Sequence, residues 1–150
     1  MSKPAASEPR SIVVEYDLPH PPAKVWRALT EPALISKWLM ENDFRAEVGH
    51  RFHFRAQPMP HWDGLVQCEV REVEPRKRLR FTWVGGSKEH GTHLDTQVTW
   101  TLTATASGGT LLRLEHAGFL PENPFALEGM SKGWGGPIRQ RLEALLAELT

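Results

Sequence analysis

The segment "VWRALTEPALISKWLM", residues 25–40, decides the fold class because it predicts two very short apolar helices in direct succession. Pro21 and Pro22 suit the start of the first helix and Pro32 suits the first turn of the second, where the N–H group that proline lacks has no helical partner. Thr30 is the predicted N-cap of the second helix. Before both helices, "SIVVEYDL" at residues 11–18 has the β-branched composition of a strand. Helices this short do not form a layer of their own, so we expect them to close a gap beside a sheet.

Alternating apolar and polar residues between about residue 43 and residue 117 predict antiparallel strands with one buried and one exposed face. The clearest case is "LDTQVTWTLTA", with apolar Leu94, Val98, Trp100 and Leu102, and with polar Asp95, Gln97, Thr99, Thr101 and Thr103. "SGG" at 107–109 predicts a hairpin turn into the next strand. On that strand one face carries Leu112, Leu114 and His116.

The C-terminal segment returns to a helical pattern, with an apolar stripe formed by Ile138, Leu142, Leu145, Leu146 and Leu149. Because Pro137 cannot donate to the carbonyl four residues earlier, we expect the helix to kink sharply or to begin afresh near it. The order of elements predicts an α+β domain in which a curved antiparallel sheet of about six or seven strands wraps around a long C-terminal helix. The two short helices follow the first strand. We expect residues 11–150 to form this single domain and residues 1–10 to form a disordered lead.

The composition argues against several classes of function. Lys and Arg together number 18, as do Asp and Glu, so no net charge attracts nucleic acid. Cys68 is the single cysteine and cannot form an internal disulfide. No stretch has the length and apolar character of a signal peptide or a membrane span. We therefore expect a cytoplasmic protein that binds no nucleic acid.

Metal and catalytic sites find little support in the sequence. His50 and His53 are three residues apart on a predicted strand, so they should point to opposite faces. His90 and His93 have no acidic or thiol partner at a spacing typical of zinc sites. Cys68 falls in a strand and is expected to be a buried structural thiol. We expect no metal, no cofactor and no identifiable catalytic residue.

Five motifs in this order resemble the SRPBCC (START-like, birch-pollen-allergen-like) superfamily, which has the helix-grip fold. More narrowly, the chain resembles the family of the heat-shock-protein-90 ATPase activator homologue. The motifs are "PPAKVWRALTEPALISKWL", "EVGHRFHF", "EVREVEPRKRLRFTW", "VTWTLTATASGGTLLRLEHAGF" and the "GW" before the last helix. The resemblance covers residues 12–149. "WGGPIRQ" at 134–140 departs from the regular helix that relatives usually have there.

The resemblance implies three functions. Members of the superfamily bind lipids, polyketides, hormones or other hydrophobic molecules, so we expect binding of a hydrophobic or aromatic small molecule in an internal cavity between the sheet and the C-terminal helix. The first alternative is a chaperone-regulating, protein-binding module, with a chaperone or a second copy of the chain (a homodimer) as partner. The second alternative is a polyketide cyclase/dehydratase-like enzyme. No general acid–base pair is evident, which favours binding over catalysis.

The residues expected to line the cavity are mostly aromatic. Six tryptophans against one tyrosine exceed what a small core usually needs, and tryptophan commonly lines aromatic pockets. The predicted lining consists of Trp38, Phe52, Phe54, Phe81, Trp83, Trp100, Leu114, His116, Phe119, Trp134 and Ile138.

Two of these residues have alternative interpretations. His116 is either a satisfied histidine at the end of the sheet or a hydrogen-bonding group at the rim of the pocket, aimed at a polar end of the ligand. Trp134 either covers the cavity mouth, with His116 and Phe119 nearby, or packs into ordinary core. Glu69 and Arg71 are further polar candidates, but a bulge in their strand, residues 65–73, would reverse their facing.

Overall fold

The computed structural model describes residues 10–58, 63–86, 93–120 and 124–149. The strands of the described residues are β1 (Arg10–Leu18), β2 (Glu41–Asn42), β3 (Arg51–Arg55), β4 (Leu65–Glu74), β5 (Arg78–Gly85), β6 (Leu94–Ala104) and β7 (Thr110–Phe119). The helices are α1 (Pro22–Thr30), α2 (Pro32–Trp38), α3 (Pro124–Gly135) and α4 (Pro137–Glu148). The segment "GGSKEHG" at residues 85–91, which its composition predicts to be a polar loop, lies largely outside the described residues.

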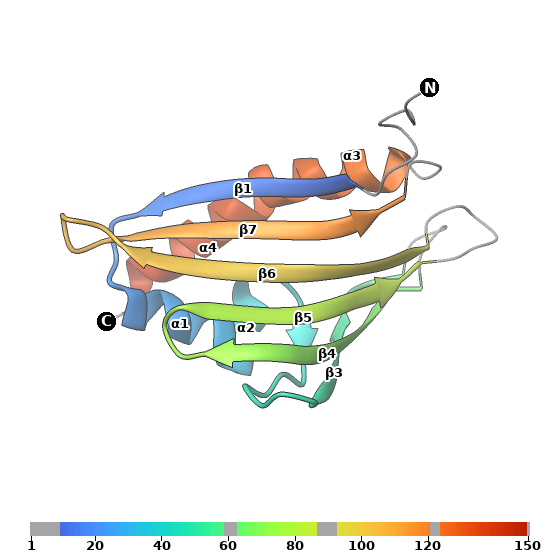
Figure 1. Ribbon diagram of the computed structural model, residues 1–150, viewed down its shortest axis with the longest axis horizontal. Helices are drawn as coiled ribbons and strands as arrows, with labels where there is room; N and C mark the ends of the chain where they lie inside the picture. The colour runs from blue at the N-terminus through green and yellow to red at the C-terminus, as the bar shows by residue number, and fades with distance from the viewer. Residues whose placement is uncertain (1–9, 59–62, 87–92, 121–123, 150) are drawn as a thin grey trace, which may run out of the picture.

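The strands form one antiparallel sheet in the order β1-β7-β6-β5-β4-β3-β2, and the helices lie on one of its faces (Figure 1). β1 and β2 are therefore at opposite edges, although only α1 and α2 separate them in the chain. The two short helices carry the chain across the sheet and pack against α4. This arrangement confirms the α+β helix-grip fold and explains why the helices are short.

The two short helices begin at Pro22 and Pro32, as predicted, and Pro21 is the N-cap of α1. The predicted cap is wrong: Glu31 occupies the N-cap of α2, and the Thr30 hydroxyl donates to the Trp26 carbonyl at 2.7 Å. The indole N–H of Trp38 donates to the Ala28 carbonyl at 2.8 Å and joins the two helices. Their connection therefore depends on a buried tryptophan.

The predicted alternation of β6 is confirmed. Val98, Trp100 and Leu102 are buried toward the helices, and Leu94 is half-buried. On the other face Thr103 is exposed, while Thr99 and Thr101 are half-buried. One face of the sheet thus supplies most of the core, and the other carries polar side chains.

A β-bulge in β4 settles the facing of residues 65–73. Val70 pairs with Phe81 and Glu72 pairs with Arg80, so Arg71 is the extra residue. Glu69 forms ion pairs with Arg51 (3.7 Å) and with Arg71 (3.8 Å), and both arginine side chains are mostly exposed. Neither Glu69 nor Arg71 is available to a ligand on the helix side.

The C-terminal helix is interrupted, as predicted. Gly136 has φ −123° and ψ −102°, which is not helical, and α4 begins afresh at Pro137. The α4 stripe buries Leu142, Leu145 and Leu146, whereas Ile138 and Leu149 are half-buried. No helix of the described residues is long and apolar enough to span a membrane.

Replacement of Trp100 by Ala should test this facing. Trp100 is 1 % exposed, so we expect its truncation to lower the free energy of unfolding by about 3–5 kcal/mol. Thr103→Ala, on the exposed face of the same strand, should change it by less than about 0.5 kcal/mol. Urea unfolding of both variants measures the difference. A similar small loss in both would contradict the assignment of the buried face.

Candidate functional site

A continuous row of aromatic rings runs between the sheet and the helices. Trp38 of α2 contacts Trp100 of β6, with ring centroids 5.9 Å apart. Trp100 contacts Trp134 of α3 at 5.6 Å, and Trp134 contacts Trp83 of β5 at 5.7 Å. All three contacts are edge-to-face or nearly so, the arrangement that aromatic quadrupoles favour. Four of the six tryptophans therefore form one buried row.

The row continues toward β3 through phenylalanines. Trp83 contacts Phe54 at 5.3 Å, and Phe54 contacts Phe52 at 5.3 Å. Phe44, in the loop between β2 and β3, packs edge-on against Phe52 at 5.0 Å. Phe44 is 3 % exposed and closes this end of the interior. The sequence pattern did not identify it, because it lies outside any strand.

A chain of buried hydrogen bonds crosses this aromatic interior. The Trp134 indole N–H donates to His116 Nδ1 at 3.1 Å. His116 Nε2 lies 2.7 Å from Thr96 Oγ1, and the Thr96 hydroxyl donates to the Trp83 carbonyl at 2.8 Å. An indole only donates, so Nδ1 must accept and Nε2 must carry the proton. Every bond in the chain then has one donor and one acceptor.

The ionisable groups of the interior are held neutral. Burial lowers the pKa of His116 to about 3, so the imidazole is uncharged at neutral pH. Burial also raises the pKa of the Tyr16 hydroxyl and that of the Cys68 thiol. The interior therefore offers fixed hydrogen-bonding groups rather than charges. The prediction that Cys68 is buried is confirmed.

Trp134 is fixed at its backbone as well as at its indole. The Tyr16 hydroxyl of β1 donates to the Trp134 carbonyl at 2.6 Å. In an unbroken helix this carbonyl would accept from the N–H group of Ile138, but the break at Gly136 separates the two helices. The Arg139 guanidinium lies over the Tyr16 ring, 5.5 Å from its centroid. Tyr16 therefore satisfies an acceptor that the helix break exposes.

The structure brings the predicted lining residues together on the helix side of the sheet. All except Ile138, which is half-buried, are at most 4 % exposed. His116 is hydrogen-bonded at both nitrogens, as the first interpretation of it requires. Trp134 is fully buried and so lies in the core rather than over a mouth, although His116 and Phe119 are adjacent as predicted. A ligand cavity among these side chains stays a prediction.

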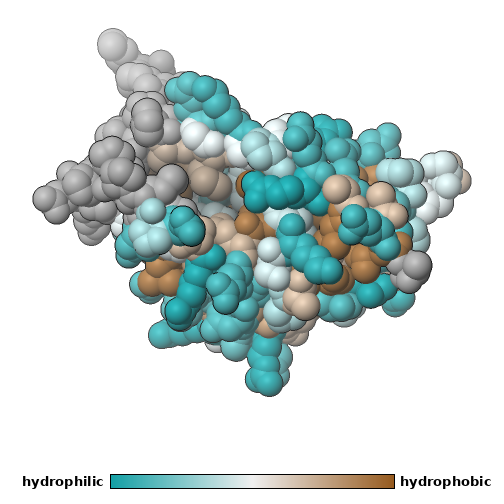
Figure 2. All heavy atoms as spheres, turned by 180° about the vertical axis from the view of Figure 1, so that it is seen from behind, coloured by the Kyte–Doolittle hydropathy of each residue, from teal (hydrophilic) through white to brown (hydrophobic). Residues whose placement is uncertain are grey.

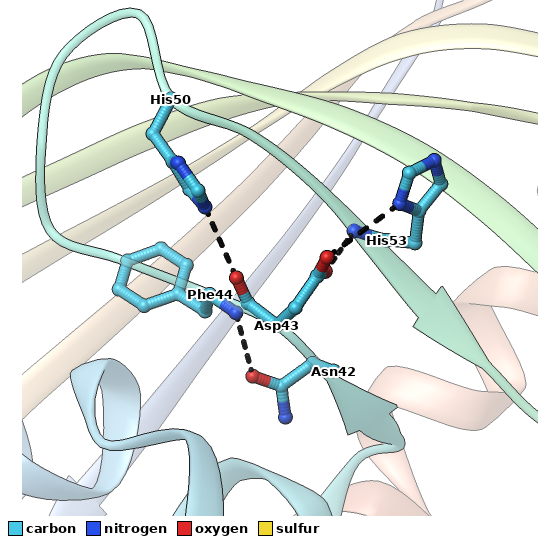
Figure 3. A network of polar contacts seen from close by, with 5 residues as sticks. All are labelled: Asn42, Asp43, Phe44, His50 and His53. Atoms are coloured by element: carbon cyan, nitrogen blue, oxygen red, sulfur yellow. Dashed lines mark hydrogen bonds and ion pairs between the residues drawn. The ribbon is translucent and has the colours of Figure 1, made fainter.

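A second, polar feature lies on the surface, at the edge formed by β2 and β3. A pocket of about 210 Å³ is lined by Glu41, Asn42, Asp43, His53 and Arg55. The Asp43 carboxylate accepts from the His53 backbone N–H at 2.6 Å, and this bond lowers the pKa of Asp43 (Figure 3). The network holds the loop that carries Phe44 into the interior.

The two histidines of this network do not lie as the strand pattern predicts. β3 begins at Arg51, so strand alternation does not govern His50. The His50 Nε2–H donates to the Asp43 carbonyl at 3.0 Å, and His53 Nδ1 lies 3.8 Å from the Asp43 carboxylate (Figure 3). Both rings thus approach one residue. Even so, the described residues contain no group of three His, Cys, Asp or Glu side chains able to hold a metal ion.

Comparison with known proteins establishes the family. The model of the family described as "Activator of Hsp90 ATPase homolog 1-like protein" matches residues 19–147. The chain therefore belongs to this family, which is part of the SRPBCC superfamily. No curated protein matches the sequence.

Several solved structures share the fold. The chain is similar to protein MLL2253 from Mesorhizobium loti, with 45 % identity, a TM-score of 0.86, and 94 % of this chain and 99 % of that chain covered. It is also similar to BH1534 from Bacillus halodurans, with 28 % identity, a TM-score of 0.73, and coverage of 91 % and 96 %. CalU16 from Micromonospora echinospora gives 26 % identity, a TM-score of 0.73, and coverage of 96 % and 80 %.

The buried histidine should make stability depend on pH. The pKa of His116 is 6.5 when it is unperturbed and about 3 in the fold, so only the unfolded chain binds this proton in between. Stability is therefore complete above pH 6.5 and falls with decreasing pH, by up to about 1.4 kcal/mol per pH unit. We expect His116→Gln to flatten this slope in urea unfolding between pH 7 and pH 4.5. Parallel curves for the two proteins would contradict the burial of a neutral imidazole.

Proposed function

We propose that the protein binds a hydrophobic or aromatic small molecule in the interior between the sheet and the helices α3 and α4. The observation that carries this proposal is the hydrogen-bonded His116 within a row of aromatic rings. Ligand pockets are mostly apolar and contain a few fixed polar groups that orient the ligand. His116, Thr96 and Tyr16 are polar groups of this kind, and each comes from a different strand. The helix-grip fold of the family supports a ligand-binding domain in general.

The second candidate is a chaperone-regulating, protein-binding module, which the family description favours. A docking surface of this kind usually has a contiguous apolar patch. Among the described residues, the large apolar side chains that are exposed are Val13, Val48 and Leu120, which lie on three separate segments. From the helix side, apolar surface appears in separate areas among polar side chains (Figure 2). These observations favour the small-molecule proposal.

The third candidate is a cyclase-like or dehydratase-like enzyme. Such an enzyme needs two titratable groups able to exchange protons with one bound substrate. Tyr16, Cys68 and His116 are the interior groups whose pKa values burial shifts, and each is shifted toward its neutral form. Tyr16 and His116 both bond to Trp134 instead of standing free. Binding is the better-supported function.

The site can be tested with two matched variants of β7. Leu114 is fully buried toward the helices, and Leu111 is half-buried on the opposite face. Leu114→Phe should weaken binding of the fluorescent hydrophobic probe N-phenyl-1-naphthylamine by about tenfold or more, because added volume fills the interior. Leu111→Phe makes the same chemical change outside and should leave binding unaltered. Circular dichroism checks that both variants fold.

The same experiment has two outcomes that would count against the proposal. Equal probe binding by the two variants would mean that the probe binds outside the interior. Failure of the wild-type protein to bind the probe, together with no small molecule retained on purification as judged by native mass spectrometry, would remove the ligand-binding function itself.

A further inference from the structure

The indole of Trp134 occupies a site built like a ligand pocket. It is fully buried, with ring centroids 5.7 Å from Trp83 at an interplanar angle of 63° and 5.6 Å from Trp100 at 84°. Its N–H group bonds to His116 Nδ1 at 3.1 Å. Apolar walls with one polar group that fixes orientation are what a small aromatic ligand requires. Here the occupant is a side chain of the protein itself.

The chain directly after Trp134 is interrupted in a way that would let the indole leave. Gly135 follows, and a Cβ added there would meet nothing within 4 Å. Gly136 is not helical, and its N–H reaches the Gly133 carbonyl at a long 3.4 Å. Pro137 contributes no N–H group to the break. The first backbone bond of α4 joins the Gln140 N–H to the Gly136 carbonyl at 3.0 Å, so rotation at the two glycines would disturb little other backbone hydrogen bonding on the α4 side.

We propose that Trp134 occupies the ligand position of the resting protein, and that the ligand is a planar aromatic molecule whose N–H or O–H group replaces the indole N–H at His116. Trp134 then moves out by rotation at Gly135 and Gly136, which also breaks the bond from the Tyr16 hydroxyl to the Trp134 carbonyl. This inference rests on the proposed interior binding function and names the class of ligand.

The hydrogen-bond chain explains why the ligand must be a donor. The Thr96 hydroxyl donates to the Trp83 carbonyl, so Thr96 can only accept from His116 Nε2–H. Nδ1 is then left as an acceptor, and burial keeps the ring from gaining a second proton. A ligand with an acceptor at this point would place two lone pairs against each other. Indole and its relatives fit, whereas an ether or an N-methylated ring does not.

The first experiment uses indole as probe and Trp134→Ala as an emptied site. When a ligand competes with a resident side chain, its apparent Kd equals the intrinsic Kd divided by the fraction of protein in the open state, so it binds more weakly. We therefore expect the variant to bind indole at least tenfold more tightly than the wild type does. In the variant, 1-methylindole should bind about tenfold more weakly than indole, because it lacks the donated hydrogen bond.

The matched control is Trp100→Ala, which removes a neighbouring indole but leaves the bond between Trp134 and His116 in place. It should not distinguish indole from 1-methylindole. Equal affinity of wild type and Trp134→Ala for indole would overturn the proposal, as would equal affinity of Trp134→Ala for the two probes.

The second experiment uses the wild-type chain and so does not depend on the folding of a variant. Protein labelled with 5-fluorotryptophan gives a ¹⁹F resonance for Trp134, which is assigned by its absence from Trp134→Phe. Saturating indole should shift this resonance and make it sensitive to a soluble paramagnetic quencher. If N-phenyl-1-naphthylamine binds in a way that Leu114→Phe weakens while Trp134 stays protected, this inference fails and the proposed function stands. If the wild type binds neither probe and retains no small molecule on purification, both fail.

Discussion

The hydrogen bond from the Trp134 indole to His116 joins helix α3 to strand β7 of the sheet. It lies in an interior without charged groups, where an unpaired donor or acceptor costs about 1–3 kcal/mol. Its direction fixes the tautomer of His116, and that tautomer determines the bonds to Thr96 and to the Trp83 carbonyl. Loss of one group of this chain would leave the neighbouring group with an unpaired hydrogen-bond donor or acceptor. The position of α3 relative to β5, β6 and β7 therefore depends on this bond.

The break in the C-terminal helix serves the same arrangement. In an unbroken helix the Trp134 carbonyl would accept from the Ile138 N–H, whereas here it accepts from the Tyr16 hydroxyl of β1. Trp134 is consequently held at its backbone by β1 and at its side chain by β7. Under the proposed binding function, the contacts that stabilise the fold are also the ones that would orient a ligand. An aromatic ligand would then have to reproduce the contacts that Trp134 makes.

Much of the fold could be predicted from the sequence, because its signals are local. Alternation along β6 identified the buried face of Trp100, and prolines at first turns identified the starts of α1, α2 and α4. The loop that carries Phe44 could not be predicted, because its apolar residues follow neither the two-residue repeat of a strand nor the 3.6-residue repeat of a helix. Its position depends on Asp43, whose carboxylate bonds to a strand ten residues later.

The aromatic residues of the candidate site could be predicted from the sequence, but the hydrogen bonds between its polar groups could not. The aromatic side chains could be assigned to the interior by their strand faces. The partners of Trp134 could not, because Tyr16 lies 118 residues away and the bond to His116 depends on how α3 packs against β7. The alternation of β6 places Thr96 on the same face as Val98 and Trp100, but the partners of its hydroxyl could not be predicted from the sequence. Only the three-dimensional structure shows that its hydroxyl completes a buried chain.

The most direct test of this account is the protonation of His116, measured by long-range ¹H–¹⁵N NMR of the imidazole rings. The account predicts that one histidine, assigned by its loss from His116→Gln, shows an unprotonated Nδ1 and a protonated Nε2 and keeps this state unchanged from pH 7 to pH 5. Protonation of this ring with a midpoint near its unperturbed pKa of 6.5, or a proton on Nδ1, would contradict it.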